Sequence, residues 1–267
     1  MKYIVSYSGG KDSTATLLWA YERYAPENII VAFCDTGWET RTTYDYVEYI
    51  SEWCESKDIS FNKIKPAMQF EELVYHKKMF PRSFRRYCTQ MLKIKPFFMF
   101  ISQIQQKEVL VGERSQESPS REKKAHTEFN EYYNCYLHRP IKDWTHDDVF
   151  KIHQKHNIKH NPMYDLGFSR VGCAPCIMAN KKDIALINKY FPEQIDKIKK
   201  LENNLQQKRE EAGLADYNNT FFKPKVVGGE TIADIDEQVY WANSTYGTTL
   251  QDFIPDSCKA SYAILCE

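Results

Sequence analysis

The chain has 267 residues, which is enough for one large domain or for one domain with an appendage. Its 36 lysines and arginines balance its 36 aspartates and glutamates, so the overall charge predicts no attraction to nucleic acids or membrane surfaces. No apolar run approaches the roughly eighteen residues of a membrane span, and the N-terminus enters a predicted strand directly, so we expect neither a span nor a signal peptide.

The first predicted unit, residues 2–24, is a strand, a glycine turn and a helix. An apolar run from Tyr3 to Val5 is typical of a buried strand, and apolar residues at helical spacing follow the turn. The turn has the sequence Ser8-Gly9-Gly10-Lys11-Asp12-Ser13. Such a turn directs backbone N–H groups and a helix N-terminus toward an anion, while its lysine and serines add donors. The alternative, a plain glycine turn with an exposed lysine, does not explain the full segment.

This segment is not a Walker A loop, because Asp12 follows the lysine and no glycine stands five residues before Gly10. It resembles the PP-loop of the adenine nucleotide alpha hydrolase superfamily, which includes ATP pyrophosphatases, tRNA-thiolating enzymes, FAD synthetase and the phosphoadenosine phosphosulfate (PAPS) reductase group. The resemblance implies chemistry at the α-phosphorus of ATP or of a sulfonucleotide. The implied roles are catalysis for Lys11 and Ser13, and nucleotide binding for Ser8, Gly9, Gly10 and Asp12. Asp12 either organises Mg²⁺ or caps the helix.

A second buried strand is predicted over residues 28–33, and it ends in the segment Cys34-Asp35-Thr36-Gly37-Trp38-Glu39. The spacing leaves two roles open for Asp35, contact with a nucleotide or formation of the turn. The Asp-Thr-Gly-x-Glu pattern resembles the PAPS reductase group, which implies nucleotide contacts by Asp35, Thr36 and Gly37. A third strand is predicted over residues 59–65. The alternation of strand and helix predicts an α/β fold with a doubly wound parallel sheet, Rossmann-like in type.

Residues 76–96 concentrate positive charge between aromatic residues. Such a stretch is usually a solvated face, and the alternative is a surface on which nucleic-acid bases stack while arginines hold phosphates. Within it, Cys88 is followed by Lys93 and Pro96 in the spacing of the Cys-Cys-x-x-x-Lys-x-x-Pro segment. That segment belongs to adenylylsulfate (APS) reductases, whose cysteine pair ligates an iron–sulfur cluster. Thr89 stands where the second cysteine of the pair would be.

A strand predicted at residues 108–111 opens onto a loop over residues 112–121, which contains Arg114 and Arg121. Two arginines on one loop can clamp an anion, although surface loops with ordinary charges are common. The pattern Gly-x-Arg-x-x-Glu-Ser-x-x-Arg matches the phosphate- or sulfonucleotide-contacting loop of the superfamily. The resemblance implies that Arg114 stabilises charge in the transition state and that Arg121 contacts the nucleotide.

Eight cysteines in a chain of this size without a secretion signal indicate metal ligands, catalytic thiols or buried thiols, and a cytoplasmic protein. Cys173 and Cys176 form a C-x-x-C pair, which can chelate a metal or act as a redox dithiol. Their Gly-Cys-Ala-Pro-Cys block resembles APS reductases. The resemblance implies a 4Fe–4S cluster on Cys88, Cys173 and Cys176, with zinc as the alternative metal. The fourth ligand is left open between Cys135, Cys258, Cys266 and a non-protein group, and we expect buried thiols at Cys34 and Cys54.

The resemblance covers residues 1–180, and we predict a separate helical and irregular region over residues 181–267. A charged helical segment is expected from Ile184 to Ala212, with an apolar stripe typical of a packing face. Reductases of the group have a catalytic cysteine in a Glu-Cys-Gly-Leu-His segment near the C-terminus. Here Cys258 stands between a serine and a lysine instead.

Three functions fit these patterns. The first is an enzyme that adenylates a substrate with ATP, releases pyrophosphate and lets sulfur displace AMP, with tRNA or DNA as the acceptor. The intact PP-loop supports it, because many sulfonucleotide reductases have an altered loop. The second is an APS or PAPS reductase that makes sulfite with a thioredoxin-like reductant. The third is a non-catalytic module that binds a nucleotide and a cluster. The oligomeric state is left open, with a homo-oligomer as one alternative.

Overall fold

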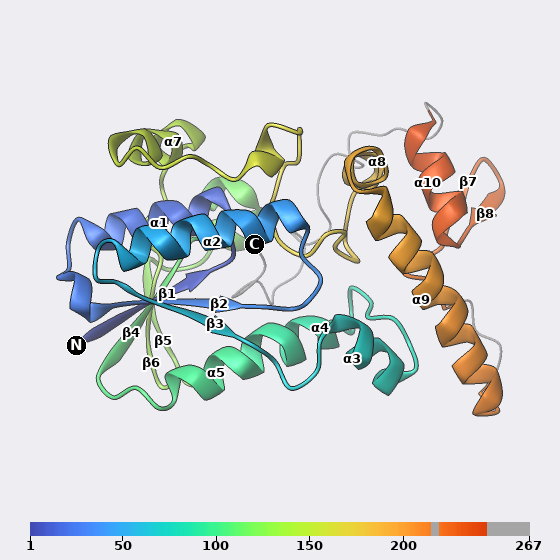
Figure 1. Cartoon of the computed structure of the whole chain (residues 1–267), viewed down its shortest axis with the longest axis horizontal. Helices are drawn as coiled ribbons and strands as arrows, with labels where there is room; N and C mark the ends of the chain where they lie inside the picture. Colours follow the sequence, from blue (N-terminus) through green and yellow to red (C-terminus); the bar gives the residue numbers. More distant parts are fainter. Residues whose placement is uncertain (215–218, 245–267) are drawn as a thin grey trace.

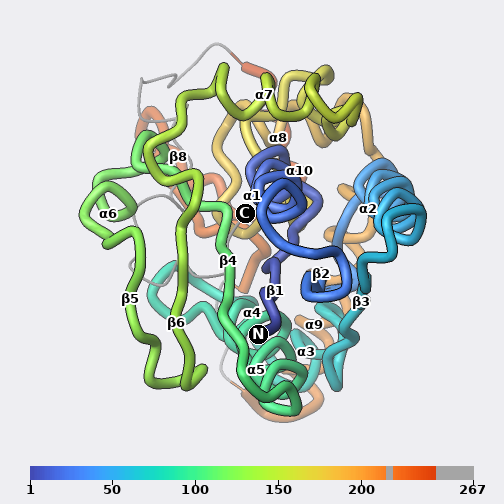
Figure 2. The backbone as a smooth tube through the Cα atoms, turned by 90° about the vertical axis from the view of Figure 1, so that its left-hand side faces the viewer, coloured from blue at the N-terminus to red at the C-terminus, as the bar shows by residue number. Residues whose placement is uncertain are grey.

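The computed structural model describes residues 1–214 and 219–244, and a six-stranded sheet forms its centre (Figure 1). The strands are β1 (Lys2–Tyr7), β2 (Ile29–Cys34), β3 (Ser60–Ile64), β4 (Lys107–Val111), β5 (Thr127–Asn130) and β6 (Cys135–His138). Their order is β3-β2-β1-β4-β6-β5, which can be followed across the sheet in Figure 2. All neighbours pair in parallel except β5 and β6, which form an antiparallel edge.

Helices cover both faces of this sheet, which confirms the doubly wound α/β fold predicted from the sequence. One face is covered by α1 (Lys11–Tyr21), α2 (Arg41–Glu55) and α7 (His146–Lys155). The other is covered by α3 (Phe70–Lys77), α4 (Tyr87–Thr89), a π-helical turn (Gln90–Ile94) and α5 (Lys95–Ile101). Because successive strand residues point to opposite faces, Val5 enters the core under α1 and α2 whereas Ile4 enters the core under α5. Within the described residues, no helix combines the length and the apolar character needed to cross a membrane.

The C-terminal elements lie beyond one end of the sheet, where α9 packs against α3 (Figure 1). They are α8 (Lys181–Tyr190), α9 (Pro192–Glu211), the hairpin of β7 (Lys225–Val227) and β8 (Glu230–Ile232), and α10 (Ile235–Asn243). The predicted helical segment is thus two helices, because Pro192 cannot continue α8 and instead begins α9. The apolar stripe of α9 is buried in the same core as Trp38 and Phe70 from the sheet region. A division of the chain at residue 180 stays a prediction.

Three loops meet at the carboxyl edge of the sheet, where β1, β2 and β4 end. The strand order reverses between β1 and β4, and in doubly wound sheets ligands bind at such a switch point. The remaining short helices lie in loops: Pro26–Asn28, Ser115–Glu117, α6 (Pro119–Glu122) and Pro162–Tyr164.

Gly112, directly after β4, touches the start of α1, and a Cβ there would lie 2.8 Å from the carbonyl group of Asp12. A glycine is therefore required for the β4 loop to approach the β1 loop this closely.

We expect the free energy of unfolding to fall as the pH rises from about 4.5 to about 8, in part through Glu202 on α9. Burial raises the pKa of Glu202 to about 7, although its carboxylate accepts the N–H groups of Phe221 (2.7 Å) and Ile235 (3.1 Å). The folded state therefore binds this proton more tightly than the unfolded state, and the resulting stability is lost as the pH passes about 7. The loss is at most about 3 kcal/mol.

Urea denaturation of wild type and Glu202→Gln at pH 5 and pH 8 measures this contribution. The variant should show a smaller difference in unfolding free energy between the two pH values, whereas Glu193→Gln, at an exposed position of the same helix, should behave as wild type. Equal pH dependence in the wild type and the Glu202 variant would contradict the assignment.

Candidate functional site

The turn between β1 and α1 presents a helix N-terminus at the carboxyl edge of the sheet. Gly9 has φ +81°, a conformation that favours glycine, and Gly10 is the N-cap of α1 without a side-chain capping bond. The Ser13 hydroxyl donates to the Gly10 carbonyl (3.0 Å) and lies 3.1 Å from the Ser8 hydroxyl oxygen. The glycines and hydroxyl groups of the predicted loop are therefore brought together at one point, as an anion-binding turn requires.

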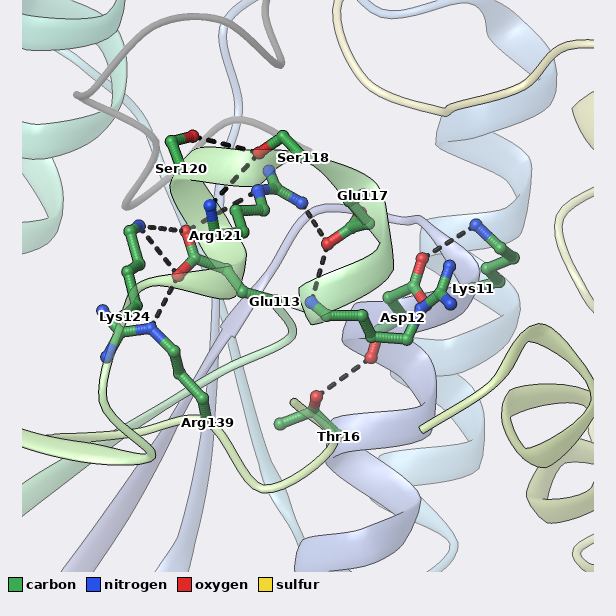
Figure 3. Close-up of polar contacts among 11 residues, drawn as sticks. Lys11, Asp12, Thr16, Glu113, Glu117, Ser118, Ser120, Arg121, Lys124 and Arg139 are labelled. Carbon is green, nitrogen blue, oxygen red and sulfur yellow. Dashed lines mark hydrogen bonds and ion pairs between the residues drawn. The ribbon is translucent and has the colours of Figure 1, made fainter. Parts of the chain in front are cut away.

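One buried carboxylate joins a cation of α1 to a cation of the loop after β4. Asp12 is fully buried; one oxygen lies 2.8 Å from Lys11 Nζ and the other 2.5 Å from Arg114 Nε. Figure 3 shows the Asp12 carboxylate facing the Lys11 side chain at the start of α1. Lys11 and Arg114 are themselves only 5% and 6% exposed. Both cations lie beside the N-terminus of α1, whose dipole and N–H groups also favour an anionic ligand.

A second ionic group orders the rest of the β4 loop. The buried Glu113 carboxylate accepts from Arg139 Nε (2.7 Å) and from Lys124 Nζ (2.7 and 2.9 Å), as Figure 3 shows. Arg121 is buried on α6, pairs with Glu117, and has its Nε 4.0 Å from Glu113. The predicted nucleotide-binding Arg121 is thus held by carboxylates of its own loop. Glu117 also accepts the Arg114 backbone N–H (2.7 Å), which links the two ionic groups.

The turn after β1 is supported by the segment after α7. The Asn161 amide donates to the Gly9 carbonyl (3.0 Å), and the Lys11 N–H donates to the Tyr164 hydroxyl (3.0 Å). His153 Nε2 lies 2.9 Å from the Lys11 carbonyl oxygen, and burial lowers the pKa of this histidine. These contacts connect the turn to α7 and to the segment that follows it. Reasoning from the sequence assigned no role to Asn161, Tyr164 or His153.

The loop after β2 folds around its own acidic residues. Asp35 accepts the Gly37 N–H (3.1 Å) and the Tyr44 hydroxyl (2.7 Å), so it acts as the turn former that the spacing left open. The Thr36 hydroxyl donates to Glu39 (2.7 Å) and lies 3.7 Å from the Cys173 sulfur. The predicted nucleotide-contacting residues Asp35, Thr36 and Gly37 therefore lie between the carboxyl edge of the sheet and the cysteine segment.

One cavity of about 60 Å³ is lined by Cys88, Cys173 and Cys176. Cys88 lies 85 residues before Cys173, and Cys176 lies three residues after it. Trp38 forms part of the cavity wall and is fixed there by two hydrogen bonds. Its indole N–H donates to the Pro175 carbonyl (3.1 Å), and the Trp38 carbonyl accepts the Ala174 N–H (2.9 Å). The remaining wall combines apolar side chains, among them Ile187 of α8, with the acidic Asp183 and three cationic side chains, those of Arg86, Lys93 and Arg170.

The three cysteines of this cavity are half-buried. Burial raises the pKa of Cys173 to about 11. The Glu39 carboxylate and Cys176 act in the same direction, and the Lys93 ammonium opposes them. Among the described residues, no three His, Cys, Asp or Glu side chains are grouped closely enough to hold a metal ion.

The other cysteines lie apart from the cavity where the structure describes them. Cys135 is buried on β6 in the core under α5, so it does not line the cavity. Cys34 and Cys54 are buried, as expected. Cys258 and Cys266, the other protein candidates for a fourth ligand, lie outside the described residues.

The amino-acid sequence matches the model of one protein family. Residues 2–179 match the sequence model of the phosphoadenosine phosphosulfate reductase domain. An uncharacterized 37.8 kDa protein of Escherichia phage 186 is 29% identical over an alignment that covers 99% of this chain and 96% of the phage protein. An adenosine 5'-phosphosulfate reductase of Lysinibacillus sphaericus is 25% identical over 56% of this chain and 63% of that enzyme. The chain therefore spans less than two thirds of that reductase, and less than half of two archaeal relatives.

Among solved structures, a phosphoadenylyl-sulfate reductase from Candida auris in complex with phosphate has the same fold. It superposes with a TM-score of 0.52 at 18% sequence identity, covering 66% of this chain and 83% of the reductase.

We expect Asp12→Asn to lower the free energy of unfolding by about 3–5 kcal/mol, because it leaves two buried cations without their anion. The matched control is Asp45→Asn, which removes an exposed carboxylate 2.8 Å from Arg41 and should cost about 1 kcal/mol or less. Urea denaturation at pH 7 compares the two variants. Equal losses would show that the Asp12 pairs contribute no more than a surface ion pair.

Proposed function

Because the chain belongs to the phosphoadenosine phosphosulfate reductase domain family, we propose that it adenylates an acceptor with ATP, releases pyrophosphate and couples this step to sulfur transfer. The observation that supports this most directly is the convergence of Lys11 and Arg114 on one buried carboxylate at the switch point between β1 and β4. A polyphosphate carries several negative charges. A helix N-terminus together with two cations offsets this charge better than a single cation would.

The proposed first step is attack of an acceptor oxygen on the α-phosphorus of ATP. The bond from the α-phosphorus to the bridging oxygen breaks, and pyrophosphate leaves with its electron pair. Lys11 and Ser13 hold the departing phosphates, with the glycine turn beneath them, while Arg114 stabilises charge on the α-phosphoryl oxygens. Mg²⁺, bound chiefly through the phosphates, supplies further positive charge. In the second step a sulfur nucleophile bonds to the activated atom, and AMP leaves with the acceptor oxygen and the electron pair of the broken bond.

The short distance between the loop and the cysteine cavity supports this coupling. Met163 lines the cavity, and the hydroxyl of the next residue, Tyr164, accepts the Lys11 N–H. On the other side, the Thr36 hydroxyl lies 3.7 Å from the Cys173 sulfur. A single helical turn, Pro162–Tyr164, therefore separates the two sites. A sulfur species held in the cavity would have a short route to an adenylated acceptor.

We further propose that Cys88, Cys173 and Cys176 hold a 4Fe–4S cluster. The donors fit this group because three thiols line one cavity and the cationic side chains around it offset thiolate charge. A cluster with three cysteine ligands supplies an iron that can bind a sulfur atom. The thiols would have to draw together around the metal, since the described residues contain no preformed set of three ligands. Zinc is the alternative metal for a thiolate site.

The second candidate function is reduction of a sulfonucleotide to sulfite with a thioredoxin-like reductant. The similarity to an adenosine 5'-phosphosulfate reductase favours it. Such a reaction needs a further thiol as nucleophile, and Cys258 lies outside the described residues.

We expect Lys11→Ala to lower the rate of pyrophosphate release from ATP by at least about 100-fold, because a buried cation at the leaving group is removed. The assay uses the whole chain, purified anaerobically, in separate reactions with ATP, alone or with tRNA or DNA, and with adenylylsulfate plus reduced thioredoxin. Lys200→Ala, at an exposed position of α9, is the matched control and should keep wild-type activity. Sulfite from adenylylsulfate, without pyrophosphate from ATP, would establish the reductase instead.

We expect Cys173→Ser to remove the bound iron and the visible absorption of the purified protein, since an alcohol is a poor iron ligand beside thiolates. Iron and zinc contents are measured by elemental analysis. Cys54→Ala is the control, because that thiol is buried between α2 and the sheet and does not line the cavity. Equal iron in wild type and the Cys173 variant would exclude this residue as a ligand, and zinc in place of iron would identify the alternative metal.

A further inference from the structure

The segment between α3 and α4 forms a small hairpin with a phenylalanine at its tip. The backbones of Arg82 and Arg85 exchange two hydrogen bonds (3.3 and 2.9 Å), which close a two-residue turn made of Ser83 and Phe84. The Phe84 side chain is 85% exposed, the largest value for a large hydrophobic residue within the described ranges. The turn therefore presents an aromatic ring to solvent between two arginines.

The base of this hairpin is fixed to the rest of the protein. Phe80 is buried and its N–H donates to the side chain of Asn219 (3.1 Å). Arg82 Nη1 donates to the Phe221 carbonyl (3.2 Å), and the Tyr87 hydroxyl donates to the Met79 carbonyl. The tip is thus held in place by the C-terminal region, so a ligand that contacts it need not order the loop first.

The surroundings of the hairpin are strongly basic although the whole chain has no net charge. No acidic residue occurs between Glu72 and Glu108. The same interval contains Lys77, Lys78, Arg82, Arg85, Arg86, Lys93, Lys95 and Lys107. Helix α9, which passes beside α3 in Figure 1, adds Arg209, whose Nη1 donates to the Lys78 carbonyl (2.7 Å). Lys77, Lys78 and Arg85 are exposed, so a positive surface surrounds the ring.

The hairpin leads directly into the cysteine cavity. Arg86 and Cys88 both line the cavity, two and four residues after Phe84. Four residues span at most about 14 Å, so the backbone of Phe84 lies within about 14 Å of Cys88 in the cavity wall.

We propose that this arginine hairpin, residues 82–86, binds single-stranded nucleic acid. An unpaired base stacks on Phe84, and the neighbouring phosphates pair with Arg85 and with the exposed Lys77 and Lys78 at the end of α3. A protruding ring selects a single strand because a base in a duplex is already stacked. The identification of this strand as the acceptor rests on the proposed function, whereas its binding requires neither ATP nor a metal.

Fluorescence anisotropy with a labelled oligonucleotide of about twelve residues, without ATP, measures this binding directly. Phe84→Ala should weaken binding by about 5-fold to about 150-fold, the effect expected for one stacked base, and Phe84→Trp should restore it. Tyr240→Ala is the matched control, because this tyrosine is 81% exposed on α10 and should leave affinity unchanged. Arg85→Gln should reduce the dependence of log affinity on log salt by about 0.7 for each phosphate that the arginine neutralises.

Three probes distinguish stacking from charge alone: an abasic strand of equal length, a duplex and polyglutamate. Weaker binding of all three supports the proposal, and a preference between RNA and DNA strands then identifies the sugar. The proposal is overturned if the abasic strand, the duplex or polyglutamate binds as tightly as the single strand. It is also overturned if Phe84→Ala binds like Tyr240→Ala. Because Phe84 touches no part of the nucleotide turn, failure here leaves pyrophosphate release from ATP unaffected.

Discussion

The buried Asp12 carboxylate is the interaction on which the site depends. It holds Lys11 from its own helix and Arg114 from the loop after β4, at 2.8 and 2.5 Å. Both cations are buried, so the carboxylate offsets part of the cost of placing their charges in the interior. The pairing is possible because Gly112 lets the β4 loop touch the start of α1. An ion triad therefore connects α1 to the loop after β4 across the switch point of the sheet.

Two candidate sites, the turn after β1 and the cysteine cavity, lie on either side of one short helical segment. The turn Pro162–Tyr164 contacts the Lys11 backbone on one side and contributes Met163 to the cysteine cavity on the other. The cavity is completed by α8, which belongs to the C-terminal helices and contributes Asp183 and Ile187 to the wall. The C-terminal region is thus part of the site, and its packing also fixes the base of the arginine hairpin.

Local signals in the sequence were sufficient to predict the central strands of the sheet and the start of the first helix. Buried apolar runs identified β1, β2 and β4, and the glycine turn identified the start of α1, because strand burial and turn chemistry depend on residues close together in the chain. The family resemblance drawn from the motif blocks is confirmed over residues 2–179. The short edge strands β5 and β6 gave no such signal, since four residues are too few to show a period.

The sequence by itself therefore determined the family, the doubly wound sheet and the residues that surround its carboxyl edge. Only the tertiary structure decided what these residues contact. Arg114 and Arg121 stand in one loop motif, yet Arg114 pairs with Asp12 on α1 whereas Arg121 is held by Glu117 in its own loop. The cavity that Cys88 and Cys173 line also includes Asp183 and Ile187 of α8, for which the sequence gave no signal. The physical reason is that pairing of buried charges and thiols depends on distances across the fold, which no periodicity along the chain encodes.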